Sequence, residues 1–202
     1  MLEDRAAAAA VGDRAAAVAA VLTQLPDQMP VVYANGYIAR EGMRQRPEGA
    51  AFPMLGSMGL AGSIGLGLAL GSRQPSVVID GDGNALMGAS ALPVIGRATA
   101  DRRCDLLHVV LDDGAYASTG GQATVSAQVD WLGFATACGY RASQPRTIGE
   151  LADETRSWLA SGGLGFLHVL IDSEGESPAP RVAHTPAELA RRLTDQLTRS
   201  PA

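Results

Sequence analysis

Two short acidic segments of the sequence contain the residue types needed for chemistry on a bound phosphate. Gly81-Asp82-Gly83 follows the apolar run SVVID, and Asp112-Asp113 ends the run LLHVVL. Glycines allow a tight turn and a close approach of the backbone, but a carboxylate facing a phosphate repels it unless a divalent cation lies between them. Carboxylate oxygens on two neighbouring strand ends are the hard ligands that Mg²⁺ prefers. The segments therefore predict a magnesium site completed by diphosphate oxygens.

Short β-branched runs alternate with helix-length segments on either side of these two motifs. This alternation predicts βαβ units, and hence an α/β domain of three layers with a mostly parallel sheet and helices on both faces. Ligands of such sheets bind beyond the carboxyl ends of the strands, where both acidic segments are expected. The expected strands are 31–34, 76–80, 106–111 and 165–171, and the expected helices lie near 57–71, 86–99, 129–138 and 147–160.

The length and hydrophobic content of the chain fit one core. With 202 residues and 47% hydrophobic content, a single domain over 1–202 is expected. Residues 1–25 are expected to form an N-terminal helix that is amphipathic or partly frayed. Two Asp-Arg pairs interrupt the alanine-rich run, which fits neither a membrane span nor a signal peptide. Residues 178–202 are expected to form a linker and a C-terminal helix that packs on the domain or on another chain.

Composition and charge exclude several classes of function. The net charge of -5 and the absence of a basic cluster argue against nucleic acid as a partner. No membrane partner is expected either, because the alanine-rich start is interrupted by charges. All sixteen basic residues are arginine, so Schiff-base and P-loop chemistry, which need a lysine, are excluded. Cys104 and Cys138 lack CxxC spacing, which predicts neither a disulfide framework nor a zinc site and fits a cytoplasmic protein.

The order of the motifs resembles the signature of thiamine diphosphate enzymes. GDGN at 81–84, followed by LDDGAY at 111–116, is similar to the family's GDG and its later pair, which is usually Asn-Asn. FPMLGSMGLAGSIGLGLALG at 52–71 resembles the segment before GDG in phosphonopyruvate and sulfopyruvate decarboxylases, and GAYASTGGQAT at 114–124 resembles their loop after the metal-binding pair. The resemblance implies the thiamine diphosphate-binding fold, and within it the diphosphate-binding (PP) domain.

The resemblance also implies roles for individual residues toward thiamine diphosphate and Mg²⁺. The metal would be held by Asp82, Asp113 and the main-chain carbonyl of Ala115. Met58 would support the cofactor in a bent shape, and Tyr116 and Ser118 would lie on the substrate side, Tyr116 also touching the cofactor. Further cofactor contacts are implied for Gly36, Tyr37, Gly56, Ser57, Gly81, Gly83, Asn84 and Ala85.

Two departures from the family pattern have consequences for these roles. Asp113 stands where an Asn is usual, and its extra negative charge would either increase the dependence on the metal or weaken cofactor binding. The segment ANGYIAREGM at 34–43 resembles the family's diphosphate-contacting loop, but has Gly36 and Tyr37 where a hydroxyl residue is often found.

Other residues have structural interpretations. His108 and His168 lie inside predicted strands and are expected to be hydrogen-bonded core residues, and His184 lies in the terminal linker. The glycines at 65, 67 and 71 lie inside a helical pattern, where small residues favour close packing over a dinucleotide site.

The resemblance predicts a split enzyme. About thirty residues precede Val31 and about thirty follow Asp172, too few for the pyrimidine-binding domain that supplies an activating glutamate in the family. We therefore expect a hetero-oligomer with a pyrimidine-binding (α-type) subunit. The expected activity is decarboxylation of a small 2-oxo acid of the phosphonopyruvate or sulfopyruvate type, whose acid group Arg40, Arg44 or Arg46 could bind. The alternatives are an acetolactate synthase-like carboligase and a non-catalytic cofactor-binding module.

Overall fold

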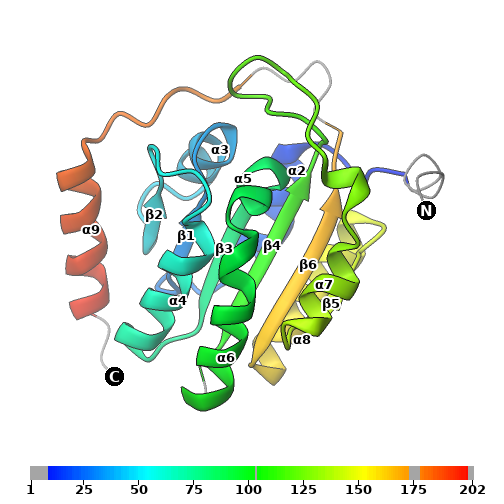
Figure 1. The fold of residues 1–202 in the computed structure, drawn as a ribbon. Coiled ribbons are helices and arrows are strands. Elements are labelled where there is room, and N and C mark those ends of the chain that lie inside the picture. Colours follow the sequence, from blue (N-terminus) through cyan, green and yellow to red (C-terminus); the bar gives the residue numbers. More distant parts are fainter. Residues whose placement is uncertain (1–8, 103, 173–177, 200–202) are drawn as a thin grey trace.

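A six-stranded sheet forms the centre of the molecule in the computed structural model, which describes residues 9–102, 104–172 and 178–199. All pairings are parallel, in the order β2-β1-β3-β4-β6-β5 (Figure 1). The sheet confirms the predicted fold class. Its strands are β1 (Val31–Tyr33), β2 (Ala51–Pro53), β3 (Ser76–Gly81), β4 (Leu106–Asp112), β5 (Arg141–Ser143) and β6 (Leu164–Leu170).

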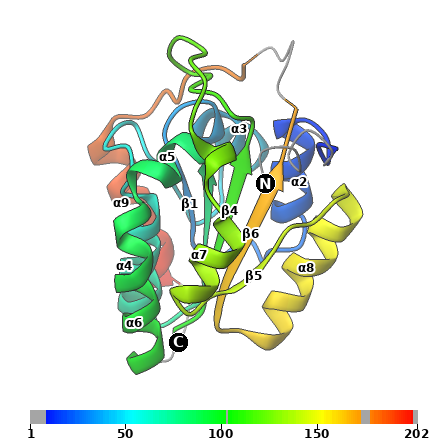
Figure 2. The same ribbon diagram turned by 45° about the vertical axis from the view of Figure 1, so that its right-hand side comes forward.

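Helices cover both faces of the sheet, as the pattern predicts. One core lies between the sheet and α2, α3 and α8, and the other between the sheet and α4, α6 and α7 (Figures 1 and 2). The helices are α2 (Arg14–Leu22), α3 (Tyr37–Gln45), α4 (Ala61–Ser72), α5 (Asp82–Met87), α6 (Leu92–Arg102), α7 (Trp131–Ala137), α8 (Ile148–Ser161) and α9 (Pro186–Arg199), with 3₁₀ turns at Ala89–Ala91 and Ser126–Gln128.

The central strands are apolar because both of their faces are buried. Val77 and Ile79 of β3 contribute to the core beneath α2, whereas Val78 between them contributes to the core beneath α4. Such two-sided burial accounts for the uninterrupted β-branched runs in the sequence. These runs made the four central strands predictable.

Several elements differ from the sequence-based expectation. The edge strands β2 and β5 were not expected, because AFP and RAS are short and lack a β-branched run. Residues 34–43 were interpreted as a loop, but α3 begins at Tyr37, after a turn in which Gly36 has φ 93°. The helix expected near 86–99 is divided at Gly88, where a Cβ would lie 2.3 Å from the carbonyl oxygen of Gly59.

The interpretation of the glycines in α4 is correct at one position and wrong at two. A Cβ on Gly65 would lie 2.3 Å from Cγ2 of Val78, so this glycine permits close packing of the helix on β3. Cβ atoms on Gly67 and Gly71 would meet nothing within 4 Å, and both residues are exposed. Close packing therefore explains only Gly65.

Both terminal helices pack on the domain. The N-terminal helix α2 begins at Arg14 and is capped by Asp13, whose carboxylate accepts a hydrogen bond from the amide of Ala16 at 2.7 Å. Residues 1–8 of the expected helix lie outside the described part of the chain. Helix α9 lies beside the edge strand β2 (Figure 1), where Arg192 Nη2 donates to the carbonyl of Pro47 at 2.7 Å.

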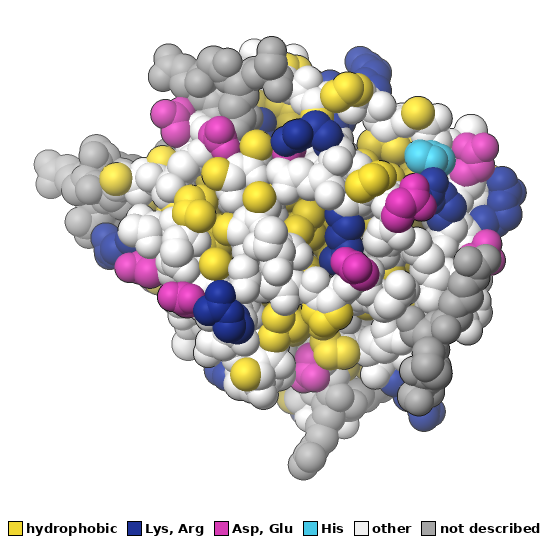
Figure 3. Space-filling model, turned by 180° about the vertical axis from the view of Figure 1, so that it is seen from behind, with side chains coloured by type: hydrophobic (Ala, Val, Ile, Leu, Met, Phe, Trp, Pro, Cys, Tyr) yellow, Lys and Arg dark blue, Asp and Glu magenta, His cyan; other side chains and the backbone are white. Residues whose placement is uncertain are grey.

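Charged side chains of both signs are interspersed on the face seen in Figure 3, without a broad field of positive charge. None of the helices in the described residues has the length and apolar character needed to cross a membrane.

Candidate active site

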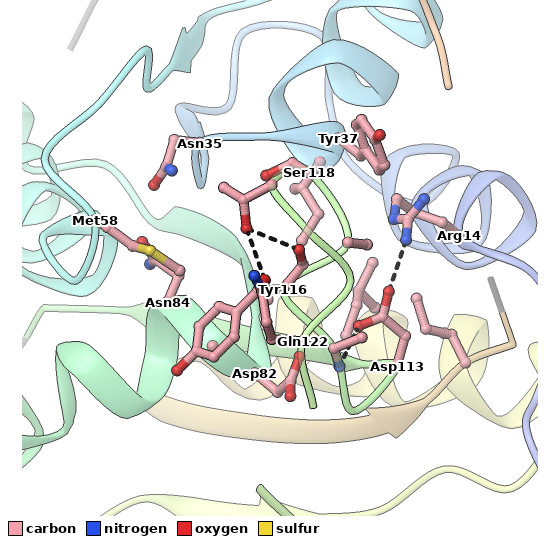
Figure 4. Close-up of a pocket in the computed structure, with 18 of the residues that line it drawn as sticks. Arg14, Asn35, Tyr37, Met58, Asp82, Asn84, Asp113, Tyr116, Ser118 and Gln122 are labelled. Atoms are coloured by element: carbon pink, nitrogen blue, oxygen red, sulfur yellow. Dashed lines mark hydrogen bonds and ion pairs between the residues drawn. The ribbon is translucent and has the colours of Figure 1, made fainter. Parts of the chain in front are cut away.

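A hollow of the molecule lies where the strand order reverses. The chain leaves β1 to form β2 on one side and returns to form β3 on the other, which is the position where ligands bind in open parallel sheets. A pocket of about 430 Å³ lies there (Figure 4). Its lining includes Asn35 after β1, Asp82 after β3, Asp113 after β4 and Ile171 after β6.

Most of the residues that the family resemblance implies line this one pocket, although they come from four separate segments. The pocket also has lining residues that the sequence did not suggest, notably Arg14 and Asn35. Gly36 lines an adjoining hollow instead, and Ala85 is buried and lines another small hollow. Gly56 and Ser57 do not line the pocket. Those that line it are Tyr37, Met58, Gly81, Asp82, Gly83, Asn84, Asp113, Ala115, Tyr116 and Ser118, and their roles toward a ligand stay predictions.

Asp82 is the most perturbed acid of the site. Its side chain is only 2% exposed. Burial raises the pKa of Asp82 to about 7, and the carboxylates of Asp112 and, more weakly, Asp113 act in the same direction. A hydrogen bond donated by the Thr124 hydroxyl lowers the pKa and offsets part of this rise. Carboxylates held together away from water favour a bound cation. The described residues contain no group of three His, Cys, Asp or Glu side chains suited to a metal, whereas the predicted site needs two carboxylates and one carbonyl.

Asp113, the departure from the family's usual Asn, forms an ion pair. Arg14 Nη2 lies 2.8 Å from Asp113 Oδ2, and the two side chains are 6% and 9% exposed. The guanidinium also lies over the ring of Tyr37, 5.3 Å from its centroid. The positive charge supplied by α2 therefore offsets the negative charge that Asp113 adds to the pocket.

Arg14 was missed because its Asp-Arg pair was considered only as evidence against a membrane span. The sequence feature that could have identified Arg14 is its position in α2. Arg14 shares a buried helix face with Ala17, Val18 and Val21, at spacings of three, four and seven. A single cation on an otherwise apolar face requires a buried partner.

Two buried histidine–aspartate pairs occupy equivalent places in the sheet. Nε2 of His108 lies 2.9 Å from Oδ2 of Asp80, and Nε2 of His168 lies 2.8 Å from Oδ2 of Asp112. In both pairs the aspartate is at or next to the last position of its strand. The histidine is on the neighbouring strand, opposite the residue two positions before the aspartate. The expectation that both are hydrogen-bonded core histidines is confirmed.

Each paired aspartate also orients the loop that follows it. The other oxygen of Asp80 accepts the amide of Gly81 at 2.9 Å and the side-chain amide of Asn84. The other oxygen of Asp112 accepts the amide of Gly114 at 3.0 Å. The turns that present Asp82 and Asp113 are therefore fixed by buried groups one strand away.

Asn84 links the loop that carries Met58 to the start of α5. Its Oδ1 accepts the amide of Gly59 at 2.7 Å, while its Nδ2 donates to Asp80. Both ends of the side-chain amide are thus engaged within the protein, although the residue lines the pocket. This arrangement points to a positioning role for the Asn84 side chain.

The loop from 114 to 124 is closed by its own backbone and forms one wall of the pocket. The amide of Tyr116 donates to the carbonyl of Gln122 at 2.8 Å, and that of Thr124 donates to the carbonyl of Gly114 at 2.8 Å. The ring of Tyr116 packs on Gly83, where a Cβ would lie 2.4 Å from the ring carbon Cε1. The second glycine of GDG therefore makes room for the tyrosine.

The three arginines suggested for an acid group have different environments. Arg44 is paired with Glu41 on its own helix, and Arg46 donates to the carbonyls of Pro26 and Asp27. Neither lines the pocket. Arg40 lines the adjoining hollow.

Comparisons with known proteins give the family of the chain. The model of the thiamine pyrophosphate enzyme, C-terminal TPP binding domain, matches residues 31–169. Phosphonopyruvate decarboxylase from Streptomyces viridochromogenes is 40% identical over 94% of this chain and 47% of its own length. Sulfopyruvate decarboxylase subunit beta from Methanothermobacter thermautotrophicus is 34% identical over 92% of this chain and 95% of its own.

A solved structure agrees with this result at the level of the fold. Benzoylformate decarboxylase from Polynucleobacter necessarius superposes with a TM-score of 0.67 at 17% identity, over 82% of this chain and 34% of that one. The chain spans about half the length of the Streptomyces relatives that it matches. The match to the family model over most of the chain, together with these relatives, shows that the chain belongs to the family of the thiamine pyrophosphate enzyme C-terminal TPP binding domain.

Proposed function

We propose that this chain is the diphosphate- and magnesium-binding subunit of a split thiamine diphosphate-dependent 2-oxo acid decarboxylase, of the phosphonopyruvate or sulfopyruvate type. The observation that carries the proposal is that Asp82, Asp113 and Ala115 all line one pocket at the strand-order reversal. The relatives named phosphonopyruvate and sulfopyruvate decarboxylase support the choice of reaction.

The donor set of the pocket fits magnesium. Asp82, Asp113 and the main-chain carbonyl of Ala115 would hold the ion, which would neutralise diphosphate oxygens. The raised pKa of Asp82 supports this role, because a buried carboxylate beside other carboxylates is stabilised by a cation. Arg14 would keep Asp113 oriented through the ion pair at 2.8 Å.

Thiamine diphosphate, when bound, supplies the electron sink needed for loss of carbon dioxide from a 2-oxo acid. The chain contributes binding, orientation and exclusion of water. Met58 would support the cofactor from one wall, and Ile38, Leu111 and Ile171 make much of the remaining lining apolar. The hydroxyls of Tyr116 and Ser118 would donate hydrogen bonds on the substrate side.

A pyrimidine-binding (α-type) subunit would complete the site. Among the described residues, no glutamate lines the pocket, so the activating glutamate would come from that partner. Large apolar side chains are exposed beside the pocket: Met58 (36%) and Met87 (56%) line it, and Leu55 and Leu60 flank Met58 along the chain. Exposed apolar groups around a pocket are typical of a surface that a partner covers. The relative named sulfopyruvate decarboxylase subunit beta, matched over 95% of its length, supports the same assembly.

Reconstitution tests the proposed split. Release of carbon dioxide from phosphonopyruvate and sulfopyruvate is measured for the purified chain alone and mixed with a candidate pyrimidine-binding subunit, both with thiamine diphosphate and Mg²⁺. Activity is expected only from the mixture, and Asp82→Ala in this chain should abolish it. Full activity of the chain alone would contradict the split. An acetohydroxy acid product instead of a free aldehyde would indicate a carboligase.

A further inference from the structure

A second hollow of about 360 Å³ adjoins the pocket and carries two arginines. Arg40 of α3 and Arg181 of the segment before α9 both line it. We propose that this hollow binds the second acid group of the substrate, a tetrahedral phosphonate or sulfonate carried on the carbon next to the carbonyl. The inference rests on the proposed function and assigns this specificity to residues of this chain.

The charge of the hollow fits a strong anion. Its lining contains two guanidinium groups and no aspartate or glutamate. Across the described part of the chain, no carboxylate forms an ion pair with Arg40 or Arg181. The planar guanidinium presents several N–H donors at once, which suits the oxygens of a phosphonate or sulfonate.

Arg40 differs from the other arginines of its neighbourhood. Its guanidinium lies over the ring of Tyr37, 5.0 Å from the centroid, which holds the side chain on the same side of α3 as the pocket wall. Arg44 is occupied by Glu41, and Arg46 by backbone carbonyls. Of the three arginines that the sequence suggested for an acid group, only Arg40 has a guanidinium that is bound neither to a carboxylate nor to a backbone carbonyl of the described residues.

The hollow and the pocket share a boundary. Asn35 and Ser118 line both. Gly36, with φ 93°, lets the Ser118 hydroxyl approach the backbone, because a Cβ there would lie 2.7 Å from Oγ. The Oδ1 atom of Asn35 is buried without a hydrogen-bond partner among the described residues. A small substrate with its carbonyl in the pocket and its second acid group in the hollow would pass these polar groups.

Binding of substrate-shaped anions tests the assignment without turnover. The probes are 3-sulfopropionate and 3-phosphonopropionate, with propionate as the probe that lacks the second acid group. Their dissociation constants are measured by calorimetry on the full chain with thiamine diphosphate and Mg²⁺. Arg40→Gln and Arg181→Gln should each weaken binding of the two diacids about tenfold, since each removes a charged hydrogen bond. Arg44→Gln, on the same helix as Arg40, should leave it unchanged.

Three results would overturn the proposal: no diacid binding to the unmodified chain, diacid binding that survives both substitutions, or an equal arginine dependence for propionate. A separate titration with thiamine diphosphate distinguishes this failure from failure of the proposed function. If the cofactor binds normally while the dissociation constants of the diacids are unchanged in both arginine variants, only the assignment of the hollow is wrong. If the diacids bind through Arg40 and Arg181 but the cofactor does not bind, the anion site stands and the proposed function fails.

Discussion

Asp82→Asn is expected to stabilise the metal-free protein at neutral pH while removing its magnesium-dependent cofactor binding. Burial and the Asp112 carboxylate raise the pKa of Asp82 to about 7 in the folded chain. An acid with a higher pKa in the folded state binds its proton more tightly there than in the unfolded state. Stability therefore falls as the pH rises from about 4 to about 7, and the asparagine variant escapes this loss.

The size of the effect follows from the shift in pKa. A change from 3.8 to about 7 corresponds to an upper limit of about 4 kcal/mol in the free energy of unfolding. Partial access of water and relaxation of the site reduce this to roughly 2 kcal/mol. For a chain of 202 residues, this corresponds to a rise in Tm of about 4 to 8 °C near pH 8.

Thermal unfolding followed by circular dichroism in the presence of a chelator checks the prediction between about pH 4 and pH 8. Asp153→Asn serves as the control, because Asp153 is an exposed carboxylate on α8. The gain at Asp82 should shrink to a small remainder near pH 4, where the carboxyl is protonated in the folded state and about half protonated in the unfolded state. A variant that is less stable than the wild type across the whole range would refute the reasoning. Adding Mg²⁺ and thiamine diphosphate should then raise the Tm of the wild type only.

The further predictions concern the ion pair, the helix glycines and one buried histidine. Arg14→Gln should cost about 3 kcal/mol by leaving Asp113 buried without its cation, and adding Asp113→Asn should recover at least about 1 kcal/mol. Urea unfolding checks this, and a double variant no more stable than Arg14→Gln would contradict it. Gly65→Ala should destabilise the protein by about 2 kcal/mol through overpacking against β3, whereas Gly67→Ala should stabilise it by about 1 kcal/mol. Urea unfolding measures both changes, and equal changes in the free energy of unfolding would refute the packing argument. His108→Ala should cost about 3 kcal/mol and weaken cofactor binding in calorimetry, and unchanged values of both would exclude its positioning role.

The sequence predicted the central sheet and the approximate place of the site because those signals are local. β3 and β4 are β-branched runs, and each ends directly at one of the acidic motifs. In a parallel sheet, neighbouring strand ends lie close together. Asp82 and Asp113 were therefore expected on one edge of the sheet, and both line the same pocket.

The parts that the sequence did not predict depend on contacts between distant segments. Arg14 and Asp113 are 99 positions apart, and no spacing rule connects an N-terminal helix to a loop after β4. Arg181, in the segment before α9, lines the same hollow as Ser118 of the loop after β4, and no local pattern in the sequence connects these two segments. Strand β2 is likewise specified by pairing with β1 rather than by its own residues, AFP.

A crystal structure with thiamine diphosphate and Mn²⁺, located by its anomalous signal, tests the central claim most directly. We expect one metal ion within about 2.2 Å of a carboxylate oxygen of Asp82, a carboxylate oxygen of Asp113 and the carbonyl oxygen of Ala115, with diphosphate oxygens completing its coordination. We also expect Arg14 to stay paired with Asp113. A metal ion bound to the diphosphate but to neither aspartate would show that these carboxylates do not form the magnesium site.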